Sequence, residues 1–202
     1  MRLVTALAKY LTAAWAITAT SRAIEVLGGN GYTEEYPAAR LYRDAQVLTV
    51  WEGPPNIQAL EVLRLAGADS PGLAAFHAKL DAILNMPFAA THSAFVRPRA
   101  LIFQARRDVA VLTALIRDDQ AEAQRQAHRL MDRMAKGLAA ALLVEEAATD
   151  WGQGDARKAV VARLFAAQEL AAPEPPRPGE SEGQMFFPLL AAYERIETAQ
   201  LD

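Results

Sequence analysis

The chain has 202 residues, no cysteine and a formal net charge of −3, and 52% of its residues are hydrophobic. This composition is typical of a globular chain with a hydrophobic core, and it excludes disordered, collagen-like and disulfide-based folds. The lack of cysteine also excludes thiolate zinc and iron–sulfur sites, and the three histidines are too scattered to predict a metal site.

Helical periodicity runs through most of the chain. Residues 3–27 carry apolar side chains at helical spacing, and Gly28-Gly29 ends this predicted helix. A glycine-rich loop over 28–37, a short helix over 38–44 and an extended or irregular segment over 45–51 are expected next.

Pro54-Pro55 opens a further helix through Leu65, because proline is tolerated in a first helical turn. The turn cluster over 68–72 is the best domain boundary, which predicts one domain over 1–67 and another over 72–202. The predicted helices of the second domain cover 72–86, 97–117, 119–148 and 154–171.

The C-terminal part begins with a proline-rich segment over 172–184, which is predicted to be a solvated linker. A last apolar helix over 185–199 is expected to dock back onto the body. The predicted fold is all-α: a helical bundle portion followed by a second helical module.

No unbroken apolar run reaches the ~20 residues that span a bilayer, and no convincing signal-peptide cleavage site follows the first apolar stretch. We therefore expect no membrane association and a cytoplasmic location.

Residues 28–57 hold the densest cluster of glycine, proline, charged and aromatic residues. Within it, Glu52 lies between Trp51 and Gly53, and Val50 precedes them. A carboxylate in such an apolar setting could be desolvated, which raises its pKa towards that of a general base working near neutrality. The alternative is a tight inter-helix loop with an exposed glutamate, and spacing alone favours this alternative.

Several linked motifs resemble the C-terminal signature of the acyl-CoA dehydrogenases. They are the double-glycine segment Leu27–Pro37, the Leu-x-Arg-Asp-Ala segment over 41–45, the aromatic-Glu-Gly loop over 51–53 and Asn56-Ile57-Gln58. Their order and spacing also match, and the resemblance covers about residues 1–66.

The resemblance implies an FAD-dependent oxidoreductase that dehydrogenates acyl-CoA thioesters between the α- and β-carbons. Glu52 stands at the position of the catalytic base, which removes the α-proton, and FAD accepts the β-hydrogen as hydride. Trp51 would wall the flavin, and Gly53 would let the thioester come close.

Other positions carry over from the same resemblance. Glu25, Gly28 and Gly29 match a segment that touches the FAD of a neighbouring subunit. Pro54 and Asn56 match a segment that contacts FAD directly, and Arg64 matches a basic position near CoA. Three of these depart from the family, which usually has glutamine in place of Glu25, threonine in place of Pro54 and a longer glutamine in place of Asn56.

The family also has an N-terminal helical domain and a β-sheet domain, and nothing in 1–202 reads as that sheet. We therefore expect this chain alone to be an inactive part of the enzyme that lacks FAD. The resemblance further implies a homodimer or homotetramer, with electron-transferring flavoprotein as the electron acceptor.

The second domain resembles, in architecture, the extra helical domain of the alkylation-response (AidB-like) branch. Residues 97–137 carry a local charge of +4, with Arg125, Arg129, Arg133 and Lys136 on roughly one helical face. The alternative function is thus a non-catalytic helical assembly module that contacts nucleic acid. A solvated helix face offset by nearby acids is the preferred interpretation of this basic stripe.

Overall fold

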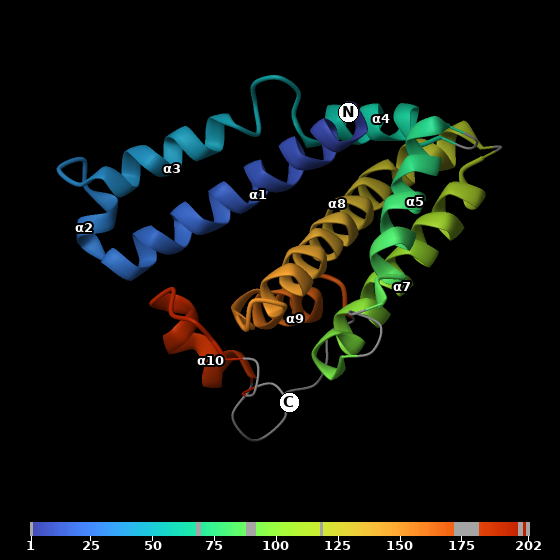
Figure 1. Ribbon diagram of the computed structural model, residues 1–202. Coiled ribbons are helices and arrows are strands. Elements are labelled where there is room, and N and C mark those ends of the chain that lie inside the picture. Colours follow the sequence, from blue (N-terminus) through green and yellow to red (C-terminus); the bar gives the residue numbers. More distant parts are fainter. Residues whose placement is uncertain are drawn as a thin grey trace. The chain divides into compact units, whose positions relative to one another are not determined.

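The computed structural model describes residues 2–67, 70–87, 92–117, 119–171, 182–197 and residue 200. The part of the chain within these ranges is helical and contains no strand, which confirms the all-α prediction (Figure 1). The helices are α1 (Arg2–Leu27), α2 (Gly29–Tyr32), α3 (Pro37–Val47), α4 (Pro55–Leu65), α5 (Pro71–Leu84), α7 (Ser93–Leu115), α8 (Gln120–Trp151), α9 (Arg157–Glu169) and α10 (Glu182–Ala191).

The chain forms two compact units. Unit 1 comprises residues 1–73 and 112–135, and unit 2 comprises residues 74–111 and 136–202. Helices α5, α7 and α8 each contribute residues to both units. The domain boundaries expected from the sequence, 1–67 and 72–202, stay a prediction. The compact units differ from these domains because residues 112–135 belong to the first unit.

In unit 1, α1 packs against α3 and α4, and α2 turns the chain at the far end of α1 (Figure 1). The predicted helix over 3–27 is confirmed, and it ends where Gly28 adopts a φ of 59°. Leu3, Leu7 and Leu11 are buried along α1. Full burial of a leucine side chain stabilises the folded state by ~1.5–3 kcal/mol, so these three residues anchor the helix.

Helix α3 is longer than predicted. Residues 45–47, expected to be extended or irregular, continue the helix, because Ala45 is buried on the same helix as Ala38 and Ala39. Residues 48–51 form a turn, in agreement with an irregular segment there. Helix α4 begins at Pro55 and ends at Leu65, as the proline pair predicted.

Helix α1 is long and apolar enough to cross a membrane, contrary to the expectation from the sequence. That criterion uses length and composition alone, and the core helix of a water-soluble domain meets it as well. In the structure, α1 buries part of its apolar surface against α3 and α4.

Helices α5, α8 and α9 lie close to their predicted ranges. Helix α7 begins at Ser93, four residues before the predicted start, and it includes Pro98. Proline removes one helical hydrogen bond, but Ala94 and Phe95 are buried at the beginning of the helix and hold this turn in the core.

The C-terminal segment differs from the predicted helix over 185–199. Helix α10 ends at Ala191, and Tyr193 adopts a φ of 57°, which breaks the helical path. The Ala156 amide then donates a 2.7 Å hydrogen bond to the Ile196 carbonyl, and Ile196 is fully buried. Burial of Phe186 and Ile196 confirms that this segment docks back, whereas most of the predicted linker, 172–181, lies outside the described residues.

Candidate functional site

The loop between α3 and α4 carries the predicted base. The Val50 and Trp51 amides both donate to the Val47 carbonyl, at 2.9 and 3.1 Å, which turns the chain tightly. Glu52 then adopts a φ of 53° and Gly53 a φ of 98°. A left-handed conformation costs a residue with a side chain roughly 1–2 kcal/mol, and such strain concentrates at functional sites. The backbone therefore marks Glu52 as a candidate functional residue on grounds independent of sequence similarity.

Two side chains, one from α1 and one from α4, bind the backbone of this loop. The Lys9 ammonium of α1 donates to the carbonyls of Leu48 and Gly53, at 2.6 and 2.9 Å. The Gln58 amide of α4 donates to the Glu52 carbonyl at 2.9 Å. Lys9 could not be predicted from the sequence, because its partners lie 39 and 44 residues away along the chain.

The loop presents its side chains to solvent. Val50 is 64% exposed, Trp51 is 53% exposed, and Glu52 is exposed as well. The expected desolvation of Glu52 by Trp51 and Val50 is therefore absent from the part of the chain that the structure describes. An apolar wall from elsewhere is needed before this carboxylate is shielded from water.

A second group of predicted residues lies at the other end of α1. Glu25 pairs with Arg22 at 2.6 Å, and a Cβ added to Gly28 or Gly29 would meet no atom beyond the neighbouring backbone within 4 Å. A helix rises 1.5 Å per residue, so Leu27 lies about 27 Å along α1 from Lys9. Figure 1 shows α2 at the far end of α1 from the loop between α3 and α4. The two groups therefore form separate faces of unit 1, not one binding site.

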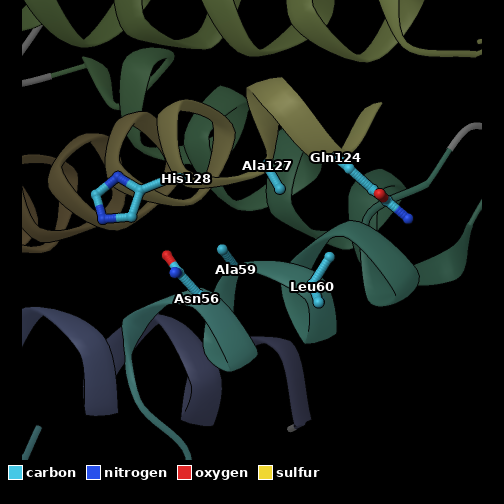
Figure 2. Close-up of a pocket in the computed structure, with 6 residues that line it drawn as sticks. All are labelled: Asn56, Ala59, Leu60, Gln124, Ala127 and His128. Atoms are coloured by element: carbon cyan, nitrogen blue, oxygen red, sulfur yellow. The ribbon is translucent and has the colours of Figure 1, made fainter. Parts of the chain in front are cut away.

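Asn56 lines a third feature, a cleft of about 300 Å³ between α4 and α8 (Figure 2). Ala59 and Leu60 lie beside Asn56 on one side, and Gln124, Ala127 and His128 form the other. Tyr10 meets the His128 ring edge-on at 5.4 Å and donates a 2.9 Å hydrogen bond to Asp132. This volume lies at the lower end of ligand-pocket sizes and is too small to enclose a dinucleotide.

Residues 1–66 match the family model described as "Acyl-CoA dehydrogenase, C-terminal domain". The chain is 37% identical over 85 residues to acyl-CoA dehydrogenase family member 11 of Caenorhabditis elegans, which is 42% of this chain and 14% of that protein. It is 45% identical over 64 residues to AidB of Escherichia coli strain K12, which is 32% of this chain and 12% of AidB. It is 46% identical over 52 residues to the rat short/branched chain specific acyl-CoA dehydrogenase, mitochondrial, which is 26% of this chain and 12% of that enzyme.

The match to this family model covers about a third of the chain. The chain spans less than a sixth of the length of these relatives. No solved structure matches it significantly.

The structure gives a physical reason for a glycine at position 53 of the loop. A Cβ on Gly53 would lie 2.7 Å from Nε2 of Gln58. Glycine at this position therefore lets Gln58 reach the loop backbone, besides tolerating the positive φ.

Arg64, which the resemblance places near CoA, forms an ion pair with a neighbouring acid. Its guanidinium donates two hydrogen bonds to Glu61, at 2.9 and 2.7 Å. The pairing raises the pKa of Arg64 and lowers the pKa of Glu61. A phosphate at this position has to compete with Glu61 for Arg64.

Two of the four residues in the basic stripe of the alternative function pair with acids of the same chain. Arg125 pairs with Glu122 at 2.7 Å, and Lys136 pairs with Glu169 at 3.3 Å. These ion pairs of Arg125 and Lys136 favour a solvated helix face over a nucleic-acid surface.

Within the described residues, no group of three or more metal-ligating side chains comes together.

Proposed function

We propose that residues 1–66 supply the C-terminal-domain part of an FAD-dependent acyl-CoA dehydrogenase, which forms the α,β double bond of acyl-CoA thioesters. The observation that carries the proposal is the loop over 48–54, which presents Glu52 and Trp51 on a strained backbone within the matched region. Strain that neighbouring side chains hold in place is typical of functional residues.

Glu52 acts as the general base in this proposal. Its carboxylate takes the α-proton as the α C–H bond breaks, and the electron pair left behind forms the new double bond. FAD, when bound, would lie against Trp51, Pro54 and Asn56 and would supply the redox chemistry as the acceptor of the β-hydrogen as hydride. Val50 and Trp51 offer apolar surface beside the carboxylate, and a covering wall there would exclude water and make Glu52 a stronger base.

The residues fit a flavin as one wall of a site, not as an enclosed pocket. Trp51 presents an exposed aromatic face, and Pro54 and Asn56 follow it at the start of α4. In the second group, Gly28 and Gly29 leave open space for close approach. The family usually has a neutral glutamine where this chain has Glu25. The Arg22 guanidinium offsets the extra negative charge of Glu25.

The proposal extends to partners and location. We assign acyl-CoA as substrate, a homodimer or homotetramer as the assembly, electron-transferring flavoprotein as the acceptor and the cytoplasm as the compartment. The loop that carries Trp51 and the turn that carries Gly28 and Gly29 lie at opposite ends of α1. This separation supports an assembly in which each of them contacts a different FAD molecule.

The test is reduction of the flavin by acyl-CoA in the FAD-loaded complete enzyme. Glu52→Gln keeps the shape of the side chain but cannot take a proton, so flavin reduction should slow by ~10²–10⁴ while FAD stays bound. Glu145→Gln is the matched control, because Glu145 pairs with Lys79 in unit 2. Near-normal flavin reduction in Glu52→Gln would reject the assignment.

A further inference from the structure

We infer that Lys9 is a positioning residue that fixes the direction of the Glu52 carboxylate. The inference rests on the proposed function, since it concerns the base of that reaction. Lys9 lies on α1, far in sequence from the loop, and it touches the loop backbone and not the Glu52 side chain. Its role is therefore to hold the residue that reacts.

The Lys9 ammonium bridges the two ends of the loop. The Leu48 carbonyl lies where the chain leaves α3, and the Gly53 carbonyl lies just after Glu52. An ammonium group has three N–H donors, and two of them serve these carbonyls. Both bonds are partly buried, so water competes less well for either carbonyl than it does on an open surface.

Gln58 completes the arrangement from the other side. Its amide donates to the Glu52 carbonyl at 2.9 Å and lies 3.4 Å from the Gly53 carbonyl. Three loop carbonyls are thus bound by donors from α1 and α4. These bonds offset the cost of the left-handed conformation at Glu52, which the surrounding structure must impose.

The consequence is that the loop relaxes when the Lys9 donors are removed. Lys9→Met keeps most of the apolar stem and loses both hydrogen bonds, whereas Lys9→Arg keeps N–H donors and charge. Gln58→Leu removes the second set of bonds without changing α1. Lys79→Met is the matched control, because Lys79 binds Glu145 within unit 2.

The first test follows cleavage after Glu52 by a glutamate-specific protease in the native full chain. Lys9→Met should be cut about tenfold faster than the wild type, because the loop opens more often. Gln58→Leu should also be cut faster, Lys9→Arg should be cut at nearly the wild-type rate, and Lys79→Met should not differ from the wild type. Equal rates for Lys9→Met and the wild type, or equal acceleration in Lys79→Met, would overturn the inference.

The second test measures turnover in the FAD-loaded complete enzyme. Lys9→Met should lower kcat and leave the KM for acyl-CoA and the FAD content near the wild type, and Lys9→Arg should restore kcat. Faster cleavage without a loss of kcat would overturn the positioning role. That outcome differs from failure of the proposed function, which would appear as normal flavin reduction in Glu52→Gln.

Discussion

Glu52 and Gly53 depend on each other at the scale of single residues. Gln58 binds the Glu52 carbonyl in the space that a Cβ on Gly53 would enter, so a side chain there would displace the Gln58 amide. Gly53 also has a φ of 98°, which residues with a Cβ rarely adopt. The loop geometry thus depends on a glycine whose role is packing as well as flexibility.

Gly53→Ala should therefore destabilise the fold by ~1–3 kcal/mol, measured as the free energy of unfolding in urea. Gly29→Ala is the matched control, since a Cβ there meets no atom within 4 Å. If the two alanine variants are equally stable, the contact between Gly53 and Gln58 does not constrain the loop.

His77 gives the stability of unit 2 a dependence on pH. Burial lowers the pKa of His77, the Arg106 guanidinium lowers it further, and the Asp81 carboxylate opposes this. The unfolded chain then takes up the proton at a higher pH than the folded chain does. Stability is fully present above the ordinary pKa of 6.5 and falls as the pH drops from there to the lowered folded pKa.

His77→Phe should remove this part of the pH dependence. Urea unfolding of the wild type and of His77→Phe, measured at several pH values below 6.5, would give the difference between their free energies of unfolding. The contributions of the acidic residues that both proteins share largely cancel in this difference. A difference in unfolding free energy that stays constant with pH would show that His77 does not titrate differently in the folded state.

At the scale of elements, the segment after α10 closes onto the turn between α8 and α9. Arg195 donates to the Gln153 and Gly154 carbonyls at 3.0 and 3.1 Å, but these bonds are exposed. Ile196 is fully buried. Apolar burial and not the arginine contacts should therefore provide most of the stability of this segment.

Ile196→Ala should cost ~2–5 kcal/mol, the range for deleting a large aliphatic side chain from a core. Arg195→Ala should cost less than that, and denaturant unfolding measures both. A larger loss for Arg195→Ala than for Ile196→Ala would reverse this assignment.

Helices with local start and stop signals could be predicted closely from the sequence. Gly28 ends α1, and Pro55 begins α4. The errors occurred where distant contacts decide the structure: burial of Ala45 extends α3, and pairing of Ile196 with Ala156 replaces the end of the last predicted helix. For the same reason, Glu52 was recognisable from its motif, whereas Lys9 and Gln58 were not.

At the scale of the whole molecule, unit 1 exposes an unusual amount of apolar surface around its glycine turn. Val26 is 86% exposed and Tyr32 is 79% exposed, and Leu27 and Tyr36 are exposed beside them. Exposed apolar patches of this kind drive association. We therefore predict that the chain self-associates through residues 1–67 as a C₂ dimer.

Light scattering of the full chain over a range of concentrations would measure this association. A Val26→Glu variant should shift the chain towards monomer, while Val96→Glu, at an exposed site in unit 2, should not. A wild-type chain that stays monomeric at every concentration would contradict the prediction.

The most direct test of the proposed function isolates the proton transfer assigned to Glu52. Exchange of the α-hydrogen of an acyl-CoA with deuterated solvent, followed by mass spectrometry in the FAD-loaded complete enzyme, reports on the base without requiring hydride transfer. Glu52→Gln should abolish this exchange, whereas Glu145→Gln should retain it. Exchange at the wild-type rate in Glu52→Gln would show that another group removes the proton.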